Sequence, residues 1–131
     1  MDFSFTSEQD QLRDTVARLV RQQYDFDTRR KVAKSEAGWR PEMWAQFAEL
    51  GLLGASFSED EGGFGGGPIE AMIISEEFGK GLVIEPYLQT VVIGGGFLRY
   101  GGTAAQKEEN LADLIGGTPD ERCRSEALFL T

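Results

Sequence analysis

Four residues in the second half of the chain have types and spacing that could form one wall of a binding site. They are separated by four, three and four positions, which places them on one face if the segment is an α-helix: Glu85, Gln89, Val92 and Gly96. Two polar side chains lead into a small apolar one and then into a position with no side chain. The pattern fits tight packing against another helix, with Glu85 favoured by the helix dipole. It also fits an apolar pocket with one polar end.

Three consecutive glycines occupy the same predicted helix, at 94–96. Each glycine in a helix interior costs about 1 kcal/mol relative to alanine. Such a cost suggests that something approaches the backbone closely, either another helix or a bound chain.

A glycine-rich loop at 62–67 invites comparison with phosphate-binding loops, because five of its six residues are glycine. It lacks the Gly-Lys-Ser/Thr ending of such loops, and no strand precedes it. Pro68 also removes one backbone donor at the start of the next helix. These features favour a structural turn over a loop that contacts a ligand.

The remaining reactive side chains do not form a catalytic set. The chain has no histidine, which removes the usual general base and most zinc sites. Its single cysteine, Cys123, excludes an intrachain disulfide and is predicted to be an inert thiol. Glu59, Asp60 and Glu61 are predicted to form a solvated turn. We therefore predict no catalytic residue and no metal ligand.

Composition and charge narrow the classes of protein. The chain has 131 residues, suited to one domain, and a net charge of −9. The acidic balance argues against non-specific binding to nucleic acid or to anionic membranes, which need positive surface. The first residues do not resemble a secretion signal, and no apolar run approaches the ~18 residues of a membrane span. These features together predict a cytoplasmic protein.

Hydrophobic periodicity and helix-start signals predict an all-α bundle of about five to six helices, with no strands. Thr6 with Gln9 and Thr103 with Gln106 are capping boxes. Pro41, Pro68 and Pro86 stand where a first helical residue is expected. The first predicted helix is 7–24. A charged connector follows at 25–38, with one short helix at 28–33. The other predicted helices run from Pro41 to a stop at Gly51, from Pro68 to Gly79–Gly81, from Glu85–Pro86 to Gly101, and from 103 to 116.

Side-chain patterns also predict which faces of these helices are buried. Leu50 is grouped with the buried face of the helix that begins at Pro41. Ile69 and Met72 join the apolar stripe of the next helix, and Glu77 lies on its wet side. The helix after Pro86 is apolar nearly all round, which predicts burial beneath another layer.

Five segments in one order and at matching spacings resemble the N-terminal helical domain of the acyl-CoA dehydrogenases. They are 5–9 (Phe-Thr-Ser-Glu-Gln), 44–54, 62–65 (Gly-Gly-Phe-Gly), 76–79 (Glu-Glu-Phe-Gly) and 102–107 (Gly-Thr-Ala-Ala-Gln-Lys). The run 82–96 looks most similar to the bacterial small-subunit type known as pimeloyl-CoA dehydrogenase. The resemblance covers about residues 2–117.

The resemblance implies an FAD-dependent oxidation of acyl-CoA to 2-enoyl-CoA. In this family a glutamate removes the α-proton, FAD takes the β-hydride, and electrons pass to an electron-transfer flavoprotein. The helical domain covers the acyl-chain pocket, and its substrate-binding wall would here be Glu85, Gln89, Val92 and Gly96. Implied partners are acyl-CoA and dehydrogenase subunits, in a homo- or hetero-oligomer, without nucleic acid or membrane.

Family members are longer, with a flavin-binding β-domain and a helical bundle that carries the base. We expect residues 1–117 to form the helical domain and 118–131 an unmatched tail, for which disorder is one expectation. The chain resembles a fragment of such an enzyme, so we expect it alone to bind no FAD and to be inactive. The alternatives are a helical module that docks on a partner, or a truncated product without activity.

Overall fold

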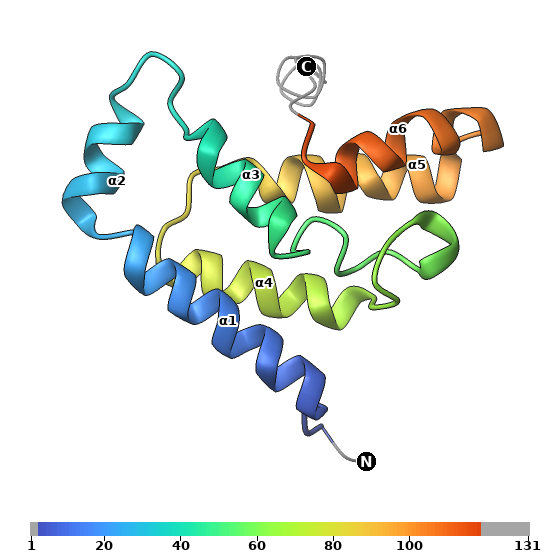
Figure 1. Cartoon of the computed structure of the whole chain (residues 1–131), viewed down its shortest axis with the longest axis horizontal. Coiled ribbons are helices and arrows are strands. Elements are labelled where there is room, and N and C mark those ends of the chain that lie inside the picture. Colours follow the sequence, from blue (N-terminus) through green and yellow to red (C-terminus); the bar gives the residue numbers. More distant parts are fainter. Residues whose placement is uncertain (1–2, 119–131) are drawn as a thin grey trace. The chain divides into compact units, whose positions relative to one another are not determined.

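The computed structural model describes residues 3–118, and every regular element in that range is helical (Figure 1). The predicted all-α fold is confirmed. The α-helices are α1 (Ser7–Gln23), α2 (Phe26–Ala33), α3 (Pro41–Glu49), α4 (Pro68–Lys80), α5 (Gly95–Gly101) and α6 (Ala104–Gly116), with a 3-10 turn η1 (Glu59–Glu61) and a π-helix η2 (Leu88–Gly94). The chain divides into two compact units, Met1–Arg40 with Pro68–Ile84, and Pro41–Gly67 with Glu85–Thr131.

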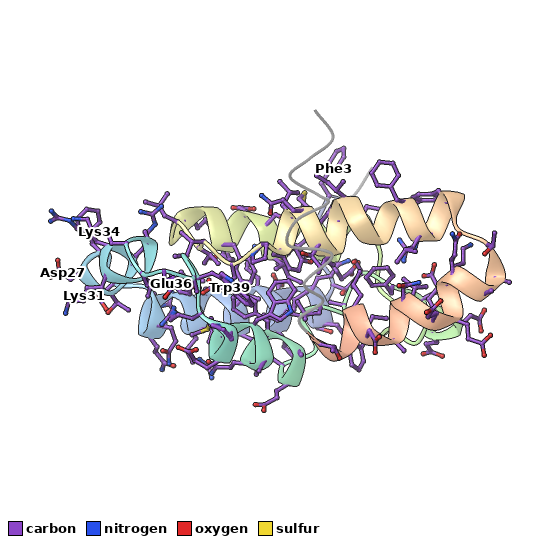
Figure 2. The ribbon with its side chains drawn as sticks, turned by 90° about the horizontal axis from the view of Figure 1, so that it is seen from above. Phe3, Asp27, Lys31, Lys34, Glu36 and Trp39 are labelled. Carbon is purple, nitrogen blue, oxygen red and sulfur yellow. The ribbon has the colours of Figure 1, made fainter. Side chains whose placement is uncertain are left out.

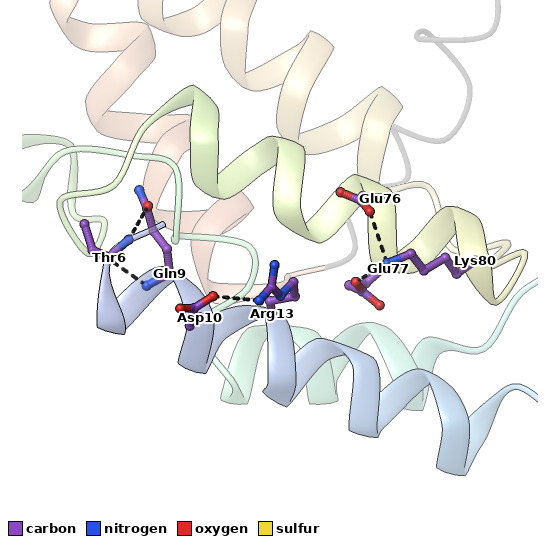
Figure 3. Close-up of polar contacts among 7 residues, drawn as sticks. All are labelled: Thr6, Gln9, Asp10, Arg13, Glu76, Glu77 and Lys80. Atoms are coloured by element: carbon purple, nitrogen blue, oxygen red, sulfur yellow. Dashed lines mark hydrogen bonds and ion pairs between the residues drawn. The ribbon is translucent and has the colours of Figure 1, made fainter. Parts of the chain in front are cut away.

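The first unit is built on α1 and α4, which lie against each other (Figure 3). The predicted capping box starts α1: the Gln9 amide donates to Thr6 Oγ1 at 3.2 Å, and the Thr6 amide donates to Gln9 Oε1 at 3.0 Å. Gln9 Nε2 also donates to Glu70 Oε1 of α4 at 2.8 Å. Gly81, the residue after α4, lies so close to α1 that a Cβ there would clash with Val20 Cγ1.

Two predictions about α4 are wrong. Glu77 was expected in solvent but is only 6% exposed, because Lys80 Nζ lies 2.6 Å from Glu77 Oε1 and supplies the opposite charge (Figure 3). Ile69 and Met72 were expected in the buried stripe but are about half exposed. The buried face instead consists of Ile73, Ile74, Glu77 and Phe78.

Helix α2 forms within the predicted connector and buries none of its residues. The Asp25 carboxylate caps it by accepting a hydrogen bond from the Thr28 amide at 2.9 Å. Arg29 Nε donates to the Leu82 carbonyl at 2.7 Å, which ties α2 to the end of α4. The polar side chains of Asp27 and Lys31, and that of Lys34 just after the helix, project from the ribbon (Figure 2).

The second unit is built from α3, the loop that follows it, and the pair α5 and α6. The buried face of α3 carries Met43, Trp44 and Phe47, whereas Leu50 is 43% exposed, contrary to the prediction. Gly51 follows with a φ of +74°, a conformation that favours glycine. Leu52, Leu53 and Phe57 are then fully or almost fully buried, and α6 contributes Leu111 and Leu114 to the core.

The helix predicted from Glu85 to Gly101 is not a continuous α-helix. Leu88–Gly94 is π-helical and Gly95–Gly101 is α-helical, while Glu85 lies in the turn before the helix. The prediction that this helix is buried all round is also wrong, because several of its large apolar side chains are exposed. Within residues 3–118, no helix has the length and hydropathy needed to span a bilayer.

Candidate functional site

The structure separates the four predicted wall residues by environment. Glu85 is 4% exposed, whereas Gln89 and Val92 are exposed on η2 and Gly96 is half-buried in α5. A π-helix closes hydrogen bonds from i to i+5, so its turns take more residues than the α-helical turns behind the one-face prediction. That premise does not apply across Leu88–Gly94, and the pocket wall itself stays a prediction.

The exposed side of η2 and α5 carries four large apolar side chains, which we call the η2–α5 apolar face: Leu88, Val92, Ile93 and Phe97. Their side chains are between 38% and 65% exposed. The spacing of five residues from Leu88 to Ile93 matches one π-helical turn, and Phe97 follows Ile93 by four. The sequence predicted that the apolar helix after Pro86 is buried as a whole, so the exposure of Leu88 and Phe97 was not expected. A face of this kind can take an alkyl chain or another apolar surface.

The opposite side of the same helix is fixed by the ring of Phe57. A Cβ on Gly95 would lie 2.5 Å from Phe57 Cζ, so only glycine allows the ring this position. A close approach to the glycine triplet is therefore present at Gly95, but it comes from the ring of Phe57 in the loop after α3 and not from another helix or a bound chain, as was expected. At Gly96 no described atom other than those of its chain neighbours and of the helix's own backbone lies within 4 Å of the Cβ position, so that glycine leaves space on its side of the helix.

An ion pair that sequence reasoning missed joins α5 to the loop beneath it. Arg99 Nη2 lies 2.8 Å from Glu61 Oε2, and Arg99 Nε lies 3.0 Å from Glu61 Oε1. Hydrogen bonds from Arg99 are the main reason that the pKa of Glu61 falls from 4.5 to about 2, and hydrogen bonds from Ser58 lower it further. Glu59 and Asp60 are exposed as predicted, but Glu61 is not part of a solvated turn.

The glycine loop is a structural turn. The amides of Gly63, Phe64 and Gly65 donate to carbonyls of Ser58, Gly54 and Phe57 at 2.9, 3.1 and 2.9 Å. Gly62 and Gly65 have φ values of +83° and +84°. These three amides and the Arg99 guanidinium are already engaged within the chain, so these groups are not available to a phosphate.

Two other sequence features can be placed. Among residues 3–118, no group of three His, Cys, Asp or Glu side chains could hold a metal ion. Cys123 and all but the first residue of the predicted tail at 118–131 lie outside the described residues.

Comparison with known proteins shows which family this chain resembles. Residues 6–118 match the family model described as acyl-CoA dehydrogenase, N-terminal domain. The chain is 34% identical over 104 residues to acyl-CoA dehydrogenase IpdE2 of Mycolicibacterium smegmatis, covering 79% of this chain and 33% of the relative. It is 32% identical over 120 residues to the probable acyl-CoA dehydrogenase YngJ of Bacillus subtilis, covering 90% and 31%.

Solved structures agree with the sequence matches. A chain of the ChsE4-ChsE5 complex from Mycobacterium tuberculosis superposes with a TM-score of 0.81 at 26% identity, covering 89% of this chain and 32% of that one. A chain of the Tcur3481-Tcur3483 steroid ACAD G363A variant superposes with a TM-score of 0.76 at 26% identity, covering 84% and 30%. The present chain thus spans about a third of the length of these proteins.

Proposed function

This chain belongs to the acyl-CoA dehydrogenase family and matches its N-terminal domain, and on that premise we propose that it supplies one wall of an acyl-chain pocket. The reaction of the assembled enzyme would be the oxidation of an acyl-CoA to a 2-enoyl-CoA. The wall would consist of the η2–α5 apolar face together with Gln89 and Gly96, and Glu85 would lie at its polar end.

The observation that carries the proposal is the exposure of the η2–α5 apolar face. Each buried methylene of an alkyl chain contributes up to about 0.8 kcal/mol. Val92 and Ile93 offer such a chain apolar contact, and the open space at Gly96 leaves room beside them. The charge of −9 argues against a nucleic-acid ligand for the same surface.

The chemistry of the reaction would come from elsewhere in the assembly. The amides of Gly63, Phe64 and Gly65 are engaged within the chain, which supports a proposal that FAD and the glutamate base are held by other domains or subunits. FAD would supply the hydride acceptor, and an electron-transfer flavoprotein would accept the electrons. We therefore propose that this chain alone is inactive. The pimeloyl-CoA type and the cytoplasmic location remain predictions.

A second function rests on the same face. One of the superposed structures is a ChsE4-ChsE5 complex, which supports a hetero-oligomer in which this chain binds a dehydrogenase subunit. In that case Leu88 and Phe97 would be covered by protein, and the chain would act as a docking module. The two functions differ in whether acyl-CoA or protein occupies the face.

Calorimetric titration with butyryl-, octanoyl- and dodecanoyl-CoA distinguishes them. The acyl-wall function predicts affinity that rises with chain length and is lost in Val92→Asp. Leu50→Asp is the matched control, because Leu50 is 43% exposed against 38% for Val92 but lies outside the face. Equal affinity for all three thioesters, or equal loss in both variants, would refute the acyl-wall function. Val92→Asp that abolishes only association with a dehydrogenase subunit would favour docking.

A further inference from the structure

Arg99 of α5 makes several polar contacts with one segment of the second unit, residues 56–61. Its guanidinium contacts both carboxylate oxygens of Glu61, and Nη2 also donates to the Ser56 carbonyl at 2.8 Å. Glu61 is itself held, because the amide and the hydroxyl of Ser58 both donate to its Oε2 at 3.0 Å. The side chains of Arg99 and Glu61 are only 23% and 19% exposed.

The ring of Phe57 lies between this ion pair and the backbone of α5. The Arg99 guanidinium carbon lies 4.8 Å from the ring centroid, within cation–π range. On another side the ring fills the space where a Gly95 Cβ would stand, 2.5 Å from Cζ. Phe57 is 2% exposed. The ring therefore contacts α5 at two points, Gly95 and Arg99, one helical turn apart.

We propose that Arg99 is a positioning residue: by binding Glu61 and the Ser56 carbonyl it holds Phe57 under Gly95, and so fixes the junction at which η2 becomes α5. Val92, Ile93 and Phe97 flank that junction, so their position depends on it. The consequence for acyl-CoA selectivity rests on the proposed function, whereas the positioning itself does not. Within this unit, the ion pair is a contact across 38 residues of sequence that links the loop to the helix.

Arginine suits this role better than lysine does. Its planar fork donates to a carboxylate through two nitrogens and can lie over an aromatic ring at the same time. Lysine keeps the charge but offers a single ammonium group, so it cannot reach Glu61, the Ser56 carbonyl and the Phe57 ring together.

Amide hydrogen exchange on the full chain tests the positioning directly. Arg99→Lys and Glu61→Gln should each accelerate exchange of the amides at 88–101 by about tenfold or more, since a charge-assisted bond is lost. Exchange in α1 of the first unit should not change. Asp60→Asn is the control, because it removes the same charge at the neighbouring position, where the side chain is exposed. The double variant should cost less than the sum of the two single variants.

Two results would overturn the inference: exchange at 88–101 that stays as in the unmodified chain, or acceleration that spreads equally to α1. If Glu61→Gln fails to fold, Arg99→Lys decides the question alone. A separate titration compares dodecanoyl-CoA with butyryl-CoA, and Arg99→Lys should reduce the ratio of their affinities. If the unmodified chain shows no such ratio, the acyl-wall function fails, while the exchange result still decides the role of Arg99.

Discussion

Two adjacent glycines of α5 should respond in opposite ways to alanine. A Cβ on Gly95 would lie 2.5 Å from Phe57 Cζ, whereas a Cβ on Gly96 would meet no described atom within 4 Å. Carbon atoms in contact lie about 3.5–4.0 Å apart, so Gly95→Ala requires the ring to move by roughly 1 Å. Phe57 is buried and lies under the Arg99 guanidinium, which prevents an easy displacement.

The magnitudes follow from two opposing effects. Overpacking a core costs about 1–3 kcal/mol, and replacing glycine by alanine in a helix gains about 0.5–1 kcal/mol. Gly95→Ala should therefore lower the free energy of unfolding, by up to about 2.5 kcal/mol. Gly96→Ala receives only the gain and should raise it by up to about 1 kcal/mol.

Urea unfolding followed by circular dichroism measures both variants, and Phe57→Leu supplies the link to the ring. Leucine lacks the Cζ atom, so Gly95→Ala should cost less in the Phe57→Leu background, which a double-mutant cycle detects. If the two alanine variants have the same stability, or if the cycle shows no coupling, the seating of α5 on Phe57 is refuted.

Three further predictions concern stability. The pKa of Glu61 is lowered to about 2, so its ion pair with Arg99 stabilises the fold fully above about pH 4.5, and this stabilisation is lost as the pH falls towards 2. Both side chains are partly exposed, so we expect Glu61→Gln to lower the free energy of unfolding by about 1–3 kcal/mol at pH 6. The difference should shrink progressively below pH 4, as measured by urea unfolding. A gap that does not change with pH would contradict this. Thr6→Ala should lower the stability by about 1 kcal/mol through loss of the α1 cap, and Thr6→Ser should restore it; equal melting temperatures for all three proteins would show that the cap is dispensable. Gly117→Ala should lower the free energy of unfolding by about 1 kcal/mol or more, because the φ of Gly117 is +71° and a Cβ there would lie 2.6 Å from Ala48 Cβ. Gly116→Ala is the matched control, because a Cβ at Gly116 has open space around it. Equal stabilities of the two variants would refute the reasoning.

Features set by neighbouring residues could be predicted from the sequence. The capping boxes at Thr6 and Thr103 place the starts of α1 and α6 correctly, because each is completed within three residues. The stop at Gly51 and the start at Pro68 are local in the same way. The all-helical class followed from such signals together with the apolar periodicity.

Features that depend on residues far apart in the chain could not be predicted from the sequence. The partial burial of Glu61 depends on Arg99, which lies 38 positions further along the chain. The π-helical geometry of Leu88–Gly94 ends where Gly95 meets Phe57, a contact that no local pattern specifies. For that reason the predicted wall assumed α-helical spacing, and the exposure of Leu88 and Phe97 was not predicted.

Photo-crosslinking tests the acyl-wall function most directly. The probe is a dodecanoyl-CoA analogue that carries a diazirine at its terminal carbon, and mass spectrometry maps the adducts on the chain. We expect adducts within residues 88–97, removed by excess unmodified dodecanoyl-CoA and lost in Val92→Asp. Adducts spread over α1 and α4, or labelling at 88–97 that the competitor does not reduce, would contradict the proposal that this domain contacts the acyl chain.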